Sequence, residues 1–268
     1  MDIRDPVFAD AVAAIDAGGV AKLDGLLTAH PYLITDRLIT GEEGYFADPY
    51  LLWFVAENPI RNHRLPANIV SVAMTIVDHL DRIAPPSRQE QLDYAVMLAA
   101  TGMVPRECGV QLPLIDALVA RGASPAGLDT TVAHNETEAA QRLIHHGATV
   151  TLTAAIVLGL ETDIARLLPA SDAAARADAL VVAANLGLTP GVARLLAAGA
   201  DPTIRSARLH RHATALHEAA LTGDVALCDM LVAAGASLTE RDDIWNGTPA
   251  GWAAHAGLAD LARRLAAP

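Results

Sequence analysis

The chain repeats a pattern of two short helical stretches, which is clearest in its last third. A threonine, a glycine and a leucine each recur at an offset of 34 residues, namely Thr214 and Thr248, Gly223 and Gly257, and Leu231 and Leu265. A threonine hydroxyl can cap a helix, and a glycine permits the positive φ that ends one. Pro249 suits the first helical position, where its missing N–H is harmless. The pattern therefore predicts two helices in each unit, with periodicity typical of stacked repeats.

This unit resembles the ankyrin repeat, whose pattern is TPLHxAAxxGxxxxVxxLLxxGAD. The match is strong over residues 179–268, where Gly199-Ala200-Asp201-Pro202 ends a further copy upstream of the two described above. Alanine is abundant and Lys22 is the only lysine, which is typical of GC-rich bacterial coding, so the chain resembles a bacterial ankyrin repeat protein. The resemblance implies an all-α solenoid that binds proteins on a concave face of first helices and projecting loops. It implies no conserved chemistry.

The units before residue 179 depart from this pattern. Over 111–178 the second-helix leucines recur too closely for two helices and a β-hairpin finger, which predicts tight turns and short, degenerate repeats. Asn135 stands where a glycine is expected, and asparagine tolerates the same backbone geometry. Residues 1–110 form divergent repeats, in which 51–58 replaces the first-helix motif and 103–109 is an insertion between helices. We expect about eight helix pairs in one continuous domain over 1–268.

Composition narrows the function classes. The net charge of −12 disfavours nucleic acid and anionic membranes as partners, because both attract a basic protein face. No apolar run is long enough to span a membrane, and the first ten residues lack the apolar core of a signal peptide. The two cysteines, Cys108 and Cys228, form no CxxC pair. These features predict a cytoplasmic protein.

The first candidate binding surface lies in the divergent repeats. Aromatic residues make up only 4% of the chain, yet five of them fall within residues 45–54. The candidate residues are Tyr45, Trp53, Glu57, Arg61 and Arg64. Aromatic and arginine side chains are typical of binding hot spots. Alternatively, the aromatic residues fill the core of a solenoid cap, and the charged residues keep that cap in solvent.

The second candidate surface lies in two successive loops near the C-terminus and the helix that follows them. The candidate residues are Arg208, His210, His212, Asp243, Trp245, Trp252 and His255. The ankyrin resemblance implies that these loops project toward a partner. Alternatively, the basic loop and the acidic loop pair with each other by opposite charge, and Trp245 packs between them.

Catalytic and cofactor signatures are weak in this sequence. His210 and His212 stand two apart, as chelating residues on a strand can, but the spacing matches no zinc signature. The ankyrin resemblance gives His217 a structural hydrogen bond between loops. The sequence contains no GxSxG, GxGxxG or phosphate-binding loop motif, and we predict no cofactor or metal. We expect a protein-binding module rather than an enzyme. The alternatives are a small-molecule or non-classical catalytic pocket among the N-terminal aromatics, and a spacer without a discrete site.

Overall fold

The computed structural model describes residues 3–41 and 43–266, and these residues form helices and loops without any strand. They divide into two compact units, which are described separately below. One unit comprises the chain up to Thr131 together with Glu136–Thr149. The other comprises Val132–Asn135 and the chain from Val150 onward. The expected fold class is confirmed, whereas the continuity of 1–268 as a single domain stays a prediction.

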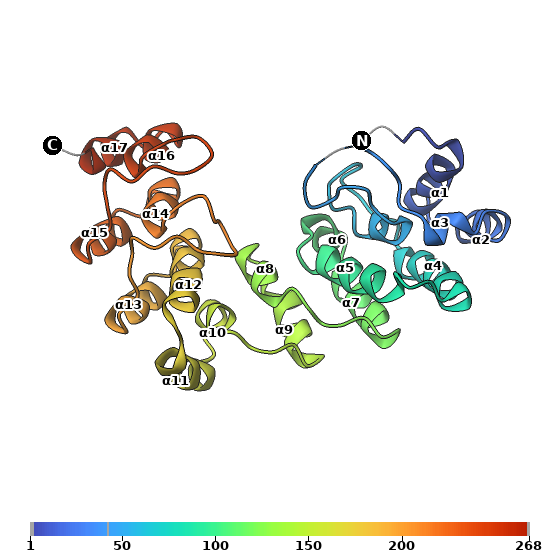
Figure 1. Ribbon diagram of the computed structural model, residues 1–268, viewed down its shortest axis with the longest axis horizontal. Helices are drawn as coiled ribbons and strands as arrows, with labels where there is room; N and C mark the ends of the chain where they lie inside the picture. The colour runs from blue at the N-terminus through green and yellow to red at the C-terminus, as the bar shows by residue number, and fades with distance from the viewer. Residues whose placement is uncertain (1–2, 42, 267–268) are drawn as a thin grey trace. The chain divides into compact units, whose positions relative to one another are not determined.

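The C-terminal unit is built from four successive helix pairs. In chain order these are α10 (Leu152–Leu158) with α11 (Glu161–Ala170), α12 (Ala173–Asn185) with α13 (Thr189–Ala197), α14 (Ala215–Thr222) with α15 (Val225–Ala233), and α16 (Pro249–His255) with α17 (Ala259–Leu265). Each first helix packs on the next, from α10 through α12 and α14 to α16. The second helices α11, α13, α15 and α17 follow one another along one side of this row (Figure 1). The loop cluster described below lies on this stack.

Small residues explain why the first helices pack so closely. Ala183, Ala184, Ala219, Ala220 and Ala253 are fully buried between them. The second helices supply the larger core side chains, as the repeated leucines predicted; Val192, Leu195, Leu227, Leu231 and Leu265 are buried. Interiors of this kind tolerate little change in volume, so the stack is a firm support for the loops it carries.

The two loops between the last three pairs contain no strand. They run from the end of α13 to α14 and from the end of α15 to α16, and only two backbone hydrogen bonds give them hairpin character. The Asp243 amide donates to the His212 carbonyl over 3.0 Å, and the Asp242 amide donates to the Gly247 carbonyl over 2.9 Å. A full β-hairpin finger, which we expected to be missing from the middle repeats, is missing from these repeats too.

The N-terminal unit repeats the pairing with altered first helices. Its elements are α1 (Pro6–Asp16), α2 (Val20–Ala29), α3 (Tyr32–Thr35), η1 (Leu51–Ala56), α4 (Ile69–Ile83), α5 (Arg88–Ala100), α6 (Met103–Glu107), α7 (Gln111–Ala120) and α9 (Thr137–His145). The stretch that replaces the ankyrin motif, η1, is a 3₁₀ helix. The predicted insertion between α5 and α7 is itself helical, as α6. Counting α8 (Leu128–Ala133) with α9, the described chain holds eight successive pairs, as expected.

The turn between α8 and α9 confirms one detailed expectation. Asn135 has φ of 59°, which is the left-handed region where a glycine was expected, and only three residues separate the two helices. Asparagine is among the residues that adopt this conformation most readily. In the described residues, no helix is both long and apolar enough to cross a membrane.

Two glycines, each following a proline near the start of a helix, allow a matched test of how closely the helices pack. A Cβ added at Gly191 in α13 would lie 2.8 Å from Ile156 Cγ2, whereas at Gly251 in α16 the nearest atom is 3.6 Å away. We expect Gly191→Ala to lower the free energy of unfolding by about 1–2 kcal/mol through overpacking. Gly251→Ala should raise it by about 0.5 kcal/mol, because alanine favours the helix. Urea titration of both variants checks this, and equal effects would contradict close packing of α13 on α10.

Candidate functional site

The aromatic residues of the N-terminal candidate surface form a buried cluster. Trp53 is only 4% exposed, and its Nε1 donates to the Gln91 carbonyl over 3.2 Å. Its ring contacts Phe46, Tyr50 and Tyr94. Trp53 therefore fills the core between η1 and α5, as the cap interpretation expected, and has almost no surface to offer a partner.

Glu57 is also an interior residue. Its side chain is 1% exposed and accepts hydrogen bonds from the amides of Arg61, over 2.7 Å, and Asn62. The Arg61 guanidinium lies 2.9 Å from Glu57 and 2.9 Å from Asp16, and also donates to the Phe54 carbonyl. These contacts close the loop after η1 and leave the Glu57 carboxylate no room for a ligand. The structure thus corrects the assignment of Trp53 and Glu57 as partner-contacting residues, since burial removes them from the surface.

Two of the five N-terminal candidates keep exposed side chains. Tyr45 is exposed, with its hydroxyl donating to Asn58 over 3.0 Å, and Arg64 is exposed on the loop before α4. Burial raises the pKa of Tyr45, so its phenol is neutral at physiological pH. A pocket that needs Tyr45, Trp53, Glu57 and Arg61 on one wall does not fit this arrangement, because the middle two face the interior.

The C-terminal candidate surface is organised by a residue outside the predicted set, Asp242. Its buried carboxylate accepts hydrogen bonds from four donors: the amides of Ile244, Trp245 and Gly247, and Trp252 Nε1. Burial alone would raise the pKa of this carboxyl, but the four hydrogen bonds outweigh burial and hold the pKa well below its usual range. Asp242 is therefore ionised at neutral pH and ties the loop before α16 to the helix itself.

Three aromatic rings form a wall beside this loop. The His212 ring stacks on Trp252 with centroids 5.6 Å apart and meets Trp245 edge to face at 5.3 Å. The Trp245 and Trp252 rings also meet edge to face, at 5.6 Å. Trp252 is almost completely buried, whereas Trp245 is 67% exposed. The wall is thus anchored by one indole and presents the other to solvent.

The aromatic wall borders a pocket of about 570 Å³ within the C-terminal unit. The residues lining it come from α12, α14, α16 and both loops, and they are Asn185, His210, His212, Glu218, Leu221, Trp245, Gly247, Gly251, Trp252 and His255. Five of the seven predicted C-terminal residues therefore meet at one pocket. This volume suits a small molecule or one or two side chains of a partner.

A buried acid and a half-buried histidine lie on the α14 side of the pocket. Glu218 is 2% exposed, its Oε2 accepts from Asn185 Nδ2 over 2.8 Å, and its Oε1 lies 3.2 Å from His210 Nδ1. The interaction with Glu218 raises the pKa of His210, since the carboxylate favours the protonated ring. His210 adopts a φ of 50°, and its ring lies beside Glu218 of α14.

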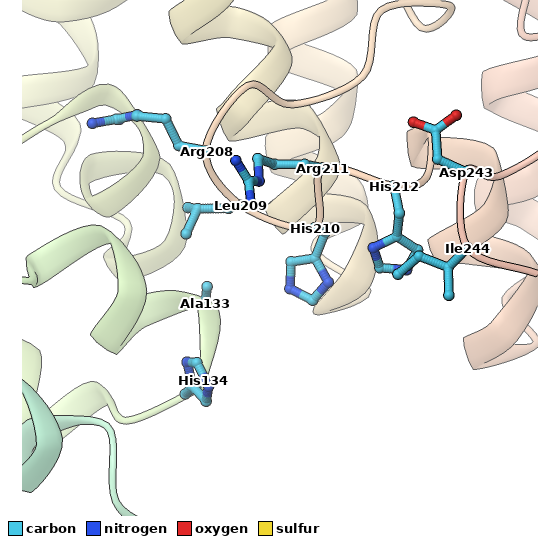
Figure 2. Close-up of a pocket in the computed structure, with 9 residues that line it drawn as sticks. All are labelled: Ala133, His134, Arg208, Leu209, His210, Arg211, His212, Asp243 and Ile244. Atoms are coloured by element: carbon cyan, nitrogen blue, oxygen red, sulfur yellow. The ribbon is translucent and has the colours of Figure 1, made fainter. Parts of the chain in front are cut away.

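The remaining two predicted residues, Arg208 and Asp243, line an adjoining hollow. Figure 2 shows the His210 and His212 rings side by side near Ile244, whereas Arg208 extends away from them. Arg208 Nε donates to the buried Asp178 carboxylate over 2.9 Å. Asp243 accepts from Arg205 over 2.6 Å, and Arg205 also pairs with Glu240. The expected pairing of the two loops by opposite charge is confirmed, but Trp245 is not packed between them.

His217 makes the predicted structural contact between the loops. Its Nδ1 lies 2.8 Å from the Thr214 hydroxyl, and its Nε2 lies 3.2 Å from the Gly247 carbonyl. Burial lowers the pKa of His217, which keeps the ring neutral. In the part of the chain that the structure describes, no group of three or more His, Cys, Asp or Glu side chains is placed to hold a metal ion.

Sequence reasoning missed Asp242, Glu218, Asn185 and Leu221. Asp242 lies in the acidic loop, but nothing in the pattern distinguishes a buried acceptor from a solvated acid. Glu218 follows His217 within the first-helix motif, at a position that faces the loops of the same repeat. A carboxylate in an otherwise apolar helix segment is the one signal that could have drawn attention to it.

Comparison with known proteins supports the repeat assignment over a limited stretch. Residues 211–243 match the family model of the ankyrin repeat. A structure similar to this chain is the ankyrin repeat domain of human ASB11, at 14% sequence identity and a TM-score of 0.42, covering 99% of both chains. No curated protein sequence matches the chain. Ankyrin repeats are generally protein–protein interaction modules, and the matched stretch includes α14, Glu218 and His212.

The role assigned to Asp242 leads to a stability prediction. Asp242→Asn keeps the shape but puts an amide N–H₂ where an acceptor is needed, so at least one buried donor loses its partner. We expect a loss of about 2–3 kcal/mol in the free energy of unfolding at pH 7, and a change in Trp245 fluorescence. Asp243→Asn is the matched control; its exposed pair with Arg205 should contribute about 0–1 kcal/mol. Equal effects of the two substitutions would contradict the role of Asp242.

A second prediction concerns the buried pair in the N-terminal unit. Glu57→Gln leaves the Arg61 guanidinium half-paired in the interior, and we expect it to lower the free energy of unfolding by about 2–3 kcal/mol. Arg64→Ala, on the exposed part of the same loop, should change it by less than about 0.5 kcal/mol. Chemical denaturation measures both. An unchanged free energy of unfolding in Glu57→Gln would mean that the carboxylate does not stabilise the fold.

Proposed function

We propose that the C-terminal unit binds a partner protein at the pocket bordered by Trp245 and Trp252. The observation that carries this proposal is the exposure of Trp245. Its side chain is 67% exposed, although hydrogen bonds to the buried Asp242 carboxylate hold its loop in place. A large apolar ring that is mostly exposed to solvent would gain free energy if a partner buried it. Its position at the mouth of a pocket is typical of an interaction hot spot.

Other exposed apolar side chains extend this surface. Ile244 is 61% exposed beside Trp245, and Leu221 lies exposed at the end of α14 on the pocket wall. Clustered exposed apolar residues are characteristic of interaction sites, whereas isolated ones are ordinary. Leu221 and Trp245 line one pocket with the half-buried His210 and His212, and this pocket suits the side chains of a bound segment.

The loop that carries Trp245 is already fixed in the free protein, which favours a role in binding a partner. Four hydrogen bonds to Asp242 and two ion pairs to Arg205 fix the loop before any partner arrives. Binding a partner would therefore cost little conformational entropy in this loop. The ankyrin match over 211–243 is consistent with this use of the loops.

Several finer expectations belong to the same proposal. We also propose a bacterial origin and a cytoplasmic location, which composition favours, and one continuous domain over 1–268, which the repeat pattern favours. The exposed Tyr45 and Arg64 offer a second contact surface in the N-terminal unit. No catalytic role is assigned to any residue.

Site-specific photocrosslinking tests the proposal. A benzophenone amino acid at Leu221, on the pocket wall, should form an adduct with one partner protein in cells. The same group at Ala226, exposed on α15, is the matched control and should form none. Trp245→Ala should reduce the Leu221 adduct at least tenfold while leaving thermal stability unchanged. Equal labelling from both positions, or an unchanged adduct in the Trp245→Ala variant, would contradict the proposal.

A further inference from the structure

We propose that the pocket takes the positively charged side chain of an arginine on the partner protein, seated against the Trp245 and Trp252 rings. This inference rests on the proposed function and adds the chemistry of the group that is recognised. Three observations on the pocket itself lead to it: the charge of its lining, the geometry of its aromatic wall and the state of the carboxylates behind that wall.

The pocket lining has one carboxylate and no permanent cation. Its ten residues include Glu218, the three histidines His210, His212 and His255, and neither lysine nor arginine. The nearby arginines are engaged elsewhere, since Arg205 pairs with Asp243 and Glu240, and Arg208 pairs with Asp178. Arg211 lines the adjoining hollow rather than this pocket. An anionic side chain would therefore find no permanent cation in the pocket lining, whereas a cationic one could pair with Glu218 in place of His210.

The aromatic wall can hold a cation chiefly against the exposed Trp245 ring, because Trp252 is only 9% exposed and has His212 stacked on it. Because Trp245 and Trp252 meet edge to face at 68°, their rings form two sides of a corner. A guanidinium within about 6 Å of an indole centroid is attracted by the ring quadrupole, most strongly for tryptophan. The Trp252 N–H donates to the Asp242 carboxylate, which pushes electron density into the indole and strengthens that attraction. Arginine also stacks flat on aromatic rings, which lysine cannot do.

The charge of Glu218 is only partly neutralised within the protein. Its Oε1 accepts no hydrogen bond of good geometry from the described residues, although His210 Nδ1 lies 3.2 Å away. His210 can release its proton when a permanent cation arrives, so the pocket can exchange a proton for a guanidinium. With Asp242, two buried carboxylates then stand behind the aromatic corner, and their field is poorly screened by solvent.

The test uses small probes and the full-length protein. The protein has three tryptophans, and their indole N–H signals in a ¹H–¹⁵N spectrum report separately on Trp245, Trp252 and the buried Trp53. We expect N-acetyl-arginine methylamide to shift the Trp245 and Trp252 signals and to leave Trp53 unmoved. The neutral, nearly isosteric citrulline derivative should bind about five- to tenfold more weakly, which corresponds to the usual strength of a cation–aromatic contact.

Substitutions distinguish the contribution of the Glu218 charge to arginine binding from that of the Trp245 ring. Glu218→Gln should weaken arginine binding about threefold or more, and Glu161→Gln, which removes an exposed carboxylate on α11 outside the pocket, should not change it. Trp245→Leu should weaken it at least fivefold, and the exposure of that ring means the fold survives the change. The dispersion of the remaining indole signals checks that each variant is folded.

The outcomes distinguish this inference from the proposed function. Equal shifts with the arginine and citrulline derivatives, or stronger shifts with leucine or glutamate derivatives, would overturn the cation assignment. If Leu221 still crosslinks to a partner in that case, binding at the pocket stands and only the recognised chemistry is wrong. If the crosslink is also absent, the proposed function fails with it.

Discussion

The Asp242 carboxylate is the interaction on which the C-terminal surface depends. Three of its four donors lie in a loop without strands, where the amides of Ile244, Trp245 and Gly247 would otherwise lack partners. Because the same carboxylate binds the Trp252 indole, loop and helix are fixed to each other by one buried charge. The exposed Trp245 is thus the consequence of a rigid loop, and the pocket beside it keeps its shape without a ligand.

The packing of the first helices explains why the single Asp242 carboxylate can fix the loop to α16. Alanines between α12, α14 and α16 bring the first helices close together, so the two loops emerge near each other. The loops can then pair through Arg205 and Asp243, and His217 of α14 can reach the Gly247 carbonyl of the second loop. The N-terminal unit also has a buried carboxylate that holds a loop, but there the aromatic side chains end up buried and not exposed. There Glu57 also accepts from loop amides, but its partner Arg61 is drawn inward and the aromatics are buried.

The sequence predicted the helices because their signals are local. Caps, turn glycines and the spacing of leucines gave the eight pairs, and Asn135 was recognised as a left-handed turn. It also selected five of the ten residues that line the C-terminal pocket. It did not distinguish Trp53 from Trp245, because burial of an indole depends on which helix faces it and not on its neighbours in the chain. Asp242 and Glu218 were missed for the same reason: an acid in a repeat is recognisable as buried only once the facing loop is placed.

Amide hydrogen exchange on the complex with the crosslinked partner tests the central claim most directly. Binding at the pocket predicts slower exchange in residues 209–213 and 243–252, with little change in the N-terminal unit. Protection confined to the N-terminal unit, or the absence of protection around Trp245, would contradict it.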